Sequence, residues 1–376
     1  MRNLKNKIVF LALLMFVLLN TQAQEPSKQP IRLAIAGLTH GHSAFILGRK
    51  DKSDFNLVGI YEPNHELAMR YAKTYNFNPN LIYDDLGKML DLVKPEAVVA
   101  FGSIFEHMAV VEACAPRGIH VMVEKPLATN VEHAKRMEEL AKKYHIYLLT
   151  DYETSWYPTT AKSFQLVNDS NSIGSIKKVV IHDGHQGPKE IGVNKEFFDW
   201  LTDPVQNGGG ALIDFGCYGA NLMTYLMKGQ KPVSVTAVTR HFKPDIYPKV
   251  DDEATIIVSY PTAQCIIQAS WNWPFGRKDM EIYGVSGYII AVNNNTMRFR
   301  NGKMDSEVTR QVTSKDIEVY IDPFSYFADV IKGKIKMTNS DPYSLENNVL
   351  VVKILDAARE SAKTGKTVLL NNINQQ

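Results

Sequence analysis

The alternation of two residue patterns between Ile31 and Thr150 constrains the fold of this chain more than any other feature of its sequence. Five short runs rich in aliphatic and β-branched residues are expected to be strands, and the segments between them carry apolar residues at helical spacing. The strand runs are residues 31–37, 56–62, 97–101, 119–124 and 146–150. Such strand–helix–strand units build a parallel sheet with right-handed connections, so the carboxyl ends of the strands share one edge, where these sheets bind ligands.

The pattern changes after Thr150, because strand-like runs then follow one another. They are residues 176–184, 233–242, 253–260, 263–271, 280–284 and 288–292. One helical stretch, residues 211–229, interrupts them directly after three consecutive glycines, and two more helical stretches near the end of the chain each close at a glycine. We therefore predict an α/β protein with a Rossmann-like, dinucleotide-binding parallel sheet in residues 24–150. Residues 151–376 are expected to form an α+β domain for substrate binding and oligomerisation, with an open, largely antiparallel sheet and C-terminal helices that pack back toward the first domain.

The first 23 residues are typical of a secretory signal peptide rather than of the fold. A basic start, residues 1–7, precedes an apolar run, residues 8–20, and small residues precede Gln24. An uncleaved membrane anchor is less favoured, since the run is shorter than the roughly 20 residues of a spanning helix. We predict export, to the periplasm in a Gram-negative cell, with no stable membrane span after cleavage.

The charge balance and the cysteines exclude some classes of function. The 42 basic and 40 acidic residues give a net charge of +2, and no basic run is long enough to bind a polyanion, so no nucleic-acid partner is expected. The three cysteines are too few for a disulfide framework, and each lies in an apolar segment. A small-molecule partner is therefore expected.

The turn after the first strand run departs from the usual dinucleotide fingerprint G-x-G-x-x-G. Its three glycine positions are Gly37, Thr39 and His42, and an extra glycine, Gly41, lies between the last two. The residues expected to contact the cofactor here are Gly37, Thr39, His40, Gly41 and His42. Glu62 ends the second strand run, where a carboxylate hydrogen-bonds an adenosine ribose and repels a 2′-phosphate, which favours NAD over NADP. Glu62 with the proline that follows it is also compatible with a plain strand end.

Two further segments carry side chains suited to chemistry. Glu124 and Lys125 end the fourth strand run and precede a proline, which places a charged pair at the ligand-binding edge. Asp214 and Tyr218 lie four residues apart in the helical stretch after the glycines, so one helix face is expected to carry both to one site.

With these motifs the chain resembles the family of glucose–fructose oxidoreductase, inositol dehydrogenase and MocA-type proteins, from about Ile31 to Leu370. The matching segments are residues 98–108, 120–130, 208–229, 281–289 and 356–370. The resemblance implies that Lys125, Asp214 and Tyr218 are the catalytic groups and that Glu124 and Lys125 lie against the nicotinamide cofactor. Many members carry His at the last catalytic position, whereas this chain has Tyr218, as in the branch similar to glucose–fructose oxidoreductase.

The resemblance implies hydride transfer between NAD and a carbon of a sugar, polyol or glycoside. Lys125 would polarise the reacting oxygen and support a Tyr218 phenolate, and Asp214 would orient the substrate. Tyr152, Trp156 and His185 are the expected substrate contacts, although the two aromatic rings are equally suited to packing between the domains. An exported enzyme meets no free nicotinamide pool, so a tightly held, internally recycled cofactor is expected.

Two alternatives stay open at this point: a redox-neutral NAD-dependent glycosidase, and a non-catalytic carbohydrate-binding or sensing protein with a degenerate cofactor site. The pairs His40 with His42, and His182 with His185 beside Asp183, have donors suited to zinc. Neither pair has a register that forces its rings together, and a catalytic zinc needs three protein ligands, so no metal is predicted. A homodimer or homotetramer is expected through the open face of the second sheet.

Overall fold

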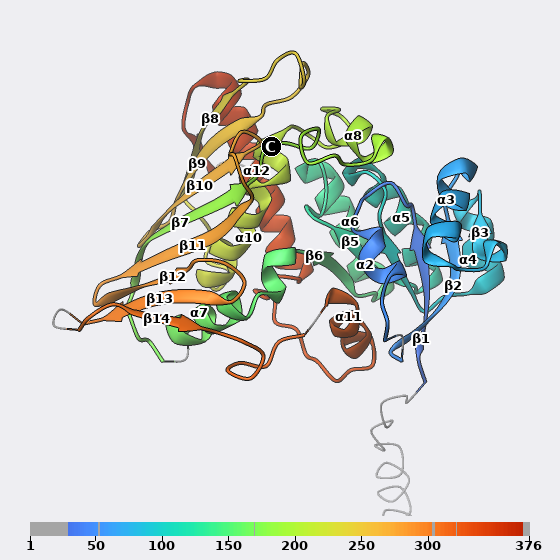
Figure 1. Ribbon diagram of the computed structural model, residues 1–376, viewed down its shortest axis with the longest axis horizontal. Coiled ribbons are helices and arrows are strands. Elements are labelled where there is room, and N and C mark those ends of the chain that lie inside the picture. The colour runs from blue at the N-terminus through green and yellow to red at the C-terminus, as the bar shows by residue number, and fades with distance from the viewer. Residues whose placement is uncertain (1–28, 52, 169, 303–304, 321, 371–376) are drawn as a thin grey trace, which may run out of the picture.

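The computed structural model in Figure 1 describes residues 29–51, 53–168, 170–302, 305–320 and 322–370. The predicted signal peptide, residues 1–23, lies outside the described residues. No helix in the described part of the chain is long and apolar enough to cross a membrane.

The first sheet has the strand order β3-β2-β1-β4-β5-β6, and all of its pairs are parallel. Its strands are β1 (Ile31–Ala36), β2 (Phe55–Tyr61), β3 (Ile82–Tyr83), β4 (Ala97–Ala100), β5 (His120–Glu124) and β6 (Leu148–Asp151). The helices between them are α2 (Ser43–Leu47), α3 (His65–Tyr75), α4 (Leu86–Val93), α5 (His107–Cys114) and α6 (Val131–Tyr144), with short 3-10 turns at Pro79–Leu81, Ile104–Glu106 and Ala115–Arg117. This is the Rossmann order, which reverses between β1 and β4, so the predicted fold of this domain is confirmed.

The second sheet has nine strands in the order β14-β13-β12-β11-β7-β10-β9-β8-β15. They are β7 (Ile176–Gly184), β8 (Ser234–Arg240), β9 (Glu253–Ser259), β10 (Gln264–Ser270), β11 (Arg277–Gly284), β12 (Gly287–Ala291), β13 (Thr296–Asn301), β14 (Val308–Gln311) and β15 (Val368–Leu369). Only the central pair, β7 with β10, is parallel among these described strands. The prediction of a largely antiparallel sheet is therefore confirmed.

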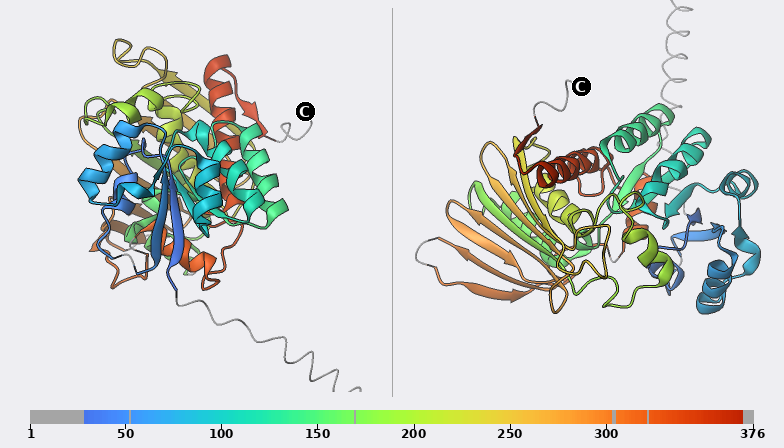
Figure 2. Two further views of the ribbon diagram at one scale, coloured as in Figure 1. Left: turned by 90° about the vertical axis from the view of Figure 1, so that its right-hand side faces the viewer. Right: turned by 90° about the horizontal axis from the view of Figure 1, so that it is seen from above.

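The remaining helices join the two sheets. They are the 3-10 turn η4 (Glu153–Trp156), then α7 (Pro158–Asn168), α8 (Lys195–Leu201), α9 (Ala211–Asp214), α10 (Gly216–Leu226), α11 (Pro323–Ile331) and α12 (Leu345–Thr364). Figures 1 and 2 show α10 and α12 between the second sheet and the first domain.

Helices α11 and α12 tie the end of the chain to the first domain. In α12, Val349 and Val352 pack in the core that contains α5 and α6, whereas Ile354 and Leu355 pack in the core of the second domain. Phe324 and Phe327 of α11 pack against the face of the first sheet that carries Ile31 and its neighbours. Helices α11 and α12 thus pack against the first domain, and α12 also packs against the second domain.

Candidate active site

A buried ion pair between the domains forms the centre of the candidate site. Lys125 directly follows β5, and its ammonium Nζ donates to the Oδ1 atom of Asp214 at 2.5 Å and to the main-chain carbonyl of Asp214 at 3.0 Å. Lys125 is only 6% exposed and Asp214 only 5%. Burial raises the pKa of Asp214, but the charge and hydrogen bond of Lys125, together with His185 and Trp271, hold the pKa below its usual value. Burial lowers the pKa of Lys125, but Asp214 together with its other negative neighbours raises the pKa above its usual value. Both groups are therefore charged at neutral pH.

The buried Trp271 indole holds the second oxygen of Asp214. Its Nε1 donates to Asp214 Oδ2 at 3.0 Å, so the two carboxylate oxygens have separate partners, Lys125 and Trp271. Trp271 was not among the predicted site residues, because it lies 57 positions from Asp214 and no local pattern links them. These two hydrogen bonds fix the plane of the Asp214 carboxylate and therefore also the position of the Lys125 ammonium group.

The expectation that Asp214 and Tyr218 share one helix is wrong. Asp214 ends α9, Phe215 stands between the helices, and Tyr218 lies in the first turn of α10. The glycine run packs closely against another segment before α9 begins. A Cβ atom on Gly210 would lie 1.8 Å from the carbonyl oxygen of Asp251. The Asp251 carboxylate meanwhile accepts the main-chain N–H groups of Gly210 and Leu212. The glycines therefore allow a close approach to the protein's own backbone.

Tyr218 nevertheless reaches the ion pair, but with its ring rather than through a stabilised phenolate. Lys125 Nζ lies 5.1 Å from the centroid of the buried Tyr218 ring, and Lys278 Nζ lies 4.7 Å from it. Burial raises the pKa of Tyr218 well above its usual value, and the negative charges of Glu153 and Asp183 add to the effect. The phenol thus keeps its proton at neutral pH, which corrects the expectation that Lys125 lowers its pKa.

A group of charged residues not predicted as site residues borders Tyr218 on the side of the second domain. Glu153 accepts hydrogen bonds from Lys278 Nζ at 2.5 Å and from the Tyr157 hydroxyl at 2.6 Å. Asp183 is 1% exposed, its Oδ1 has no hydrogen-bond partner among the described residues, and burial raises its pKa well above the usual value. Glu153 and Lys278 stand 125 positions apart, so only the fold reveals the pair.

The predicted substrate contacts behave differently from one another. Tyr152 is fully buried with its ring edge-on to Tyr218 at 5.5 Å, and Trp156 stacks on Tyr343 at 4.5 Å and donates its indole N–H to Asp151. The expectation that these two rings stack on a sugar is therefore wrong, because the protein already packs against them. His185 lies beside the centre, edge-on to Phe215 at 4.9 Å.

The predicted cofactor turn lies at the carboxyl edge of the first sheet, between β1 and β4. Gly37 has φ +85°, and a Cβ atom there would lie 2.7 Å from the main-chain nitrogen of Gly102. Position 41 does not require glycine, since a Cβ atom added there would make only an ordinary contact with the Phe197 ring at 3.8 Å. The Thr39 hydroxyl turns to the Phe101 carbonyl at 3.4 Å. One glycine of the fingerprint therefore keeps its steric role in this turn.

The two histidines of the turn converge on Glu124, which the sequence did not predict. His42 Nδ1 lies 3.0 Å from Glu124 Oε1, and His40 Nε2 lies 3.8 Å from Oε2. Burial lowers the pKa of His42, but the charge and hydrogen bond of Glu124, together with the Asp151 charge, raise it overall, whereas burial lowers the pKa of His40 to about 3. Of the two imidazoles, His42 is therefore the one whose charged form the surroundings favour.

These three residues have the spacing of metal ligands, since their ligand atoms all lie within 4.8 Å of one another. The main-chain N–H of His42 donates to His40 Nδ1 at 3.1 Å, so neutral His40 carries its proton on Nε2, the nitrogen nearer to Glu124. The second such group, His182 with Asp279 and Glu281, has its Asp279 carboxylate paired with Arg277. Hydrogen bonds explain both clusters, and the absence of a metal stays a prediction.

Glu62 lies where the sequence places it, at the end of β2. Its two oxygens accept the main-chain N–H groups of Leu38 at 2.8 Å and Asn64 at 2.9 Å. Burial raises the pKa of Glu62, and these two hydrogen bonds offset part of the effect. Each carboxylate oxygen has a second lone pair, so Glu62 can shape the turn and still accept a ribose hydroxyl.

Comparison with known proteins gives the family. Residues 31–152 match the oxidoreductase family with an NAD-binding Rossmann fold, and residues 165–290 match the GFO/IDH/MocA C-terminal domain. The trans-1,2-dihydrobenzene-1,2-diol dehydrogenase of Xenopus laevis is 30% identical over 242 residues, which cover 63% of this chain and 67% of that protein. The chain belongs to the GFO/IDH/MocA family. It is therefore an oxidoreductase, and its first domain is an NAD-binding Rossmann domain.

Solved structures share the fold over nearly the whole chain. The aldose-aldose oxidoreductase from Caulobacter crescentus, complexed with glycerol, has a TM-score of 0.74 and 22% identity, and the match covers 91% of this chain and 100% of that one. An inositol dehydrogenase homolog from Azotobacter vinelandii, complexed with NAD⁺, has a TM-score of 0.78 and 17% identity, and the match covers 91% and 97%.

The residues at the sheet edge fit NAD. The close approach of Gly37 to Gly102 at the point where the strand order reverses provides the tight turn, and the buried Glu62 carboxylate stands at the end of β2. His42, whose pKa Glu124 raises against the effect of burial, directly precedes α2, and its charged form would suit a phosphate there. The catalytic, cofactor-binding and substrate-binding roles of individual residues stay predictions.

Proposed function

We propose that this protein is an exported enzyme that transfers a hydride between tightly held NAD and a carbon of a sugar, polyol or glycoside. The buried Lys125–Asp214 pair beneath the Tyr218 ring carries the proposal, because it places a fixed cation at the carboxyl edge of an NAD-binding sheet. The names of the relatives, which act on diols, aldoses and inositol, support this class of substrate.

When bound, NAD would accept the hydride from the substrate carbon. The turn over residues 37–42 and Glu124 would hold its phosphates and nicotinamide, and Glu62 would hold its ribose. An ammonium group has three donors, and Asp214 takes two of those on Lys125, so among the described residues one stays free for the substrate oxygen. That contact polarises a carbonyl and stabilises an alkoxide.

Tyr218 would act as the acid in the direction that forms an alcohol. Its raised pKa keeps the phenol protonated at neutral pH, so the proton is available when a carbonyl accepts a hydride. The presence of tyrosine at this position is why we assign the chain to the tyrosine branch of its family.

The release of a nicotinamide compound tests the proposal. The mature protein is denatured after extensive dialysis, and absorbance and mass spectrometry of the supernatant are expected to show NAD. The variants Lys125→Met and Tyr218→Phe are expected to retain NAD and lose turnover on sugars. Absence of released NAD together with no binding of added NAD(H) or NADP(H) would instead favour a non-catalytic carbohydrate-binding protein.

Redox-neutral cleavage of a glycoside is the second candidate. Hydride transfer to NAD from one ring carbon would acidify the neighbouring C–H. Loss of that proton and departure of the aglycone with a proton would leave an unsaturated ketone, to which water would add. Return of the hydride would then give the free sugar, so no external nicotinamide would be consumed. The predicted signal sequence favours such a closed cycle, because an exported enzyme meets no nicotinamide pool. NMR spectra of a glycoside incubated without added cofactor distinguish free sugar plus aglycone from an oxidised or dismuted sugar.

We also propose that the chain forms a homodimer or homotetramer through the outer face of the second sheet. The cross-strand row Ile257, Ile266, Val180, Glu281 and Ile290 lies on that face and is partly exposed. Helices α10 and α12 cover the opposite face (Figure 2). A row of aliphatic side chains on an uncovered sheet face supports association of two copies.

A further inference from the structure

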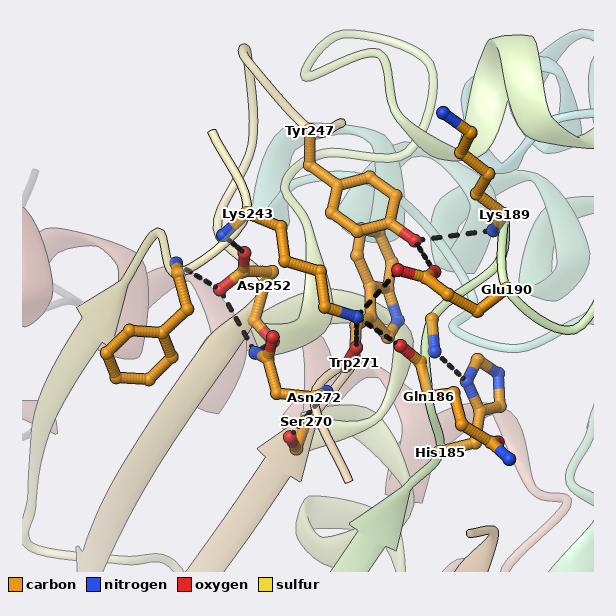
Figure 3. Close-up of polar contacts among 12 residues, drawn as sticks. His185, Gln186, Lys189, Glu190, Lys243, Tyr247, Asp252, Ser270, Trp271 and Asn272 are labelled. Carbon is orange, nitrogen blue, oxygen red and sulfur yellow. Dashed lines mark hydrogen bonds and ion pairs between the residues drawn. The ribbon is translucent and has the colours of Figure 1, made fainter. Parts of the chain in front are cut away.

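Three segments far apart in sequence meet beside the candidate active site (Figure 3). Lys243 Nζ donates to the carbonyl oxygens of Gln186 at 2.5 Å and Trp271 at 2.8 Å, and to Glu190 Oε1 at 2.7 Å. All three donors of the ammonium group are therefore used. Lys243 thus ties the segment after β7 to the segment after β10.

Tyr247 completes this group, named here the Lys243 cluster: Lys243, Glu190 and Tyr247. The Tyr247 hydroxyl donates to Glu190 Oε2 at 2.5 Å, and its ring packs on Trp271 with the centroids 5.0 Å apart. Burial alone would raise the pKa of Glu190, but the hydrogen bonds from Lys243 and Tyr247 outweigh it and lower the pKa. Glu190 therefore stays an anion that receives both donors.

The Lys243 cluster fills the space next to Gly187. This residue has φ +123°, and a Cβ atom there would lie 2.4 Å from both Glu190 Oε2 and the Tyr247 hydroxyl, and 3.0 Å from the Trp271 carbonyl oxygen. The backbone is thus held in a conformation that side chains rarely adopt. The direction of the Gly187 N–H group is fixed as a result.

That N–H group determines the state of His185. It donates to His185 Nδ1 at 2.9 Å, so the neutral ring carries its proton on Nε2 (Figure 3). The Phe215 ring connects His185 to the ion pair, since its centroid lies 4.9 Å from that of His185 and 5.9 Å from Lys125 Nζ. Burial lowers the pKa of His185, which keeps the ring neutral.

The cluster has a second connection to the same centre. Trp271, whose carbonyl accepts from Lys243, donates its indole N–H to Asp214 Oδ2 at 3.0 Å. Asp214 Oδ1 accepts from Lys125 at 2.5 Å. Trp271 therefore contacts both Lys243 and Asp214, so a shift of the Lys243 cluster would move the indole that holds Asp214.

We propose that Lys243, Glu190 and Tyr247 are positioning residues, which hold His185 as an Nε2–H hydrogen-bond donor for a substrate oxygen and fix Trp271 against Asp214. They act through His185 and Trp271 and do not touch the substrate. The proposal rests on the proposed hydride-transfer function of the Lys125–Asp214 centre. It gives His185 a role in orienting the substrate rather than in accepting a proton at Nε2, since that nitrogen already carries a proton.

Lys243→Met tests this with Lys189→Met as the matched control. Lys189 lies in the same segment and loses the same charge, but its side chain points away from the cluster (Figure 3). The ¹⁵N spectrum of His185, assigned with His185→Gln, should show a protonated Nε2 and a bare Nδ1 in the parent protein and in Lys189→Met. Lys243→Met should show a mixture of both tautomers, a KM for the sugar raised at least about tenfold, and unchanged NAD affinity.

Tyr247→Phe is the second variant, because it removes one hydroxyl and keeps the ring against Trp271. It should change the His185 spectrum in the same direction with an unchanged melting temperature. A His185 spectrum and KM in both variants equal to those of Lys189→Met would overturn the proposal. If the parent protein shows no turnover, the proposed function fails, and the tautomer spectra alone decide whether the cluster positions His185.

Discussion

At the scale of single residues, Lys125 and Asp214 stabilise each other only as a pair. Both are nearly fully buried, and each has its charge satisfied by the other. Removing one partner of such a pair leaves a buried charge without compensation, whereas replacing both leaves none. The pair that we propose as the catalytic centre therefore also makes the fold sensitive to single substitutions.

Lys125→Met is expected to lower the free energy of unfolding by about 3–5 kcal/mol, because the Asp214 carboxylate loses its cation. The double variant Lys125→Met with Asp214→Asn should recover most of this loss, while turnover stays absent in both. Urea unfolding at neutral pH measures the difference. Equal stability of the single and double variants would show that solvent, rather than Lys125, compensates Asp214.

His42 gives the cofactor turn a dependence on pH. Glu124 raises the pKa of His42 against the opposing effect of burial, and Asp151 acts in the same direction while Lys125 opposes it. The imidazolium is present below this raised pKa and disappears as the pH rises through it. NAD affinity, measured by calorimetry, should fall over that range because the phosphates lose a nearby cation.

His42→Gln should bind NAD at least about threefold more weakly than the parent protein at pH 6 and equally at high pH. Thr39→Gly is the control in the same turn, since it keeps the imidazole and opens the position of the second fingerprint glycine. Its affinity is expected to be equal or higher at every pH. A parent affinity that does not change with pH would contradict a role for His42 in holding the phosphates.

At the scale of elements, the break between α9 and α10 brings Asp214 to Lys125. The N–H of Asp214 donates to the carbonyl of Gly210 at 3.0 Å, and Gly210 itself lies against Asp251. The position of the Asp214 carboxylate thus depends on the close packing of Gly210 against Asp251.

The Gly210→Ala variant is expected to lose turnover and to have a free energy of unfolding that is lower by about 1–3 kcal/mol. The reason is that its Cβ atom would lie 1.8 Å from the Asp251 carbonyl oxygen and displace α9. Gly276→Ala is the control, since no atom lies within 4 Å of its added Cβ. Melting temperatures and sugar turnover of the two variants provide the comparison. A Gly210→Ala protein as active as Gly276→Ala would show that α9 tolerates the shift.

Strands and helices can be predicted from the sequence where their pattern of apolar residues differs from that of the neighbouring segments. Where the pattern does not differ, the bounds of an element cannot be predicted. The strands with alternating or fully apolar runs lie within a few residues of their predicted bounds. Strand β14 is exposed at all four positions, so no apolar pattern marks it. Helices α9 and α10 are buried at nearly every position, so no change of pattern marks the break at Phe215.

The same reasoning applies to the candidate site. Lys125, Asp214 and Tyr218 were found because they lie in motifs that resemble a family. Trp271, Glu153 and Lys278 were not, because each meets its partner through a contact between segments far apart in the chain. Contacts between distant segments depend on the register of strands that no local pattern specifies.

At the scale of the whole molecule, the outer face of the second sheet is the surface best suited to a second copy. Substituting Ile266→Lys adds a second charge to the row Ile257, Ile266, Val180, Glu281 and Ile290, with Val180 between it and Glu281. A buried interface tolerates an unpaired charge poorly, so the variant is expected to elute as a monomer. Leu92→Asp, at a side chain 68% exposed on α4 of the first domain, should keep the parent assembly. Light scattering after size-exclusion chromatography measures both masses, and a parent protein that is already monomeric would disprove association through this face.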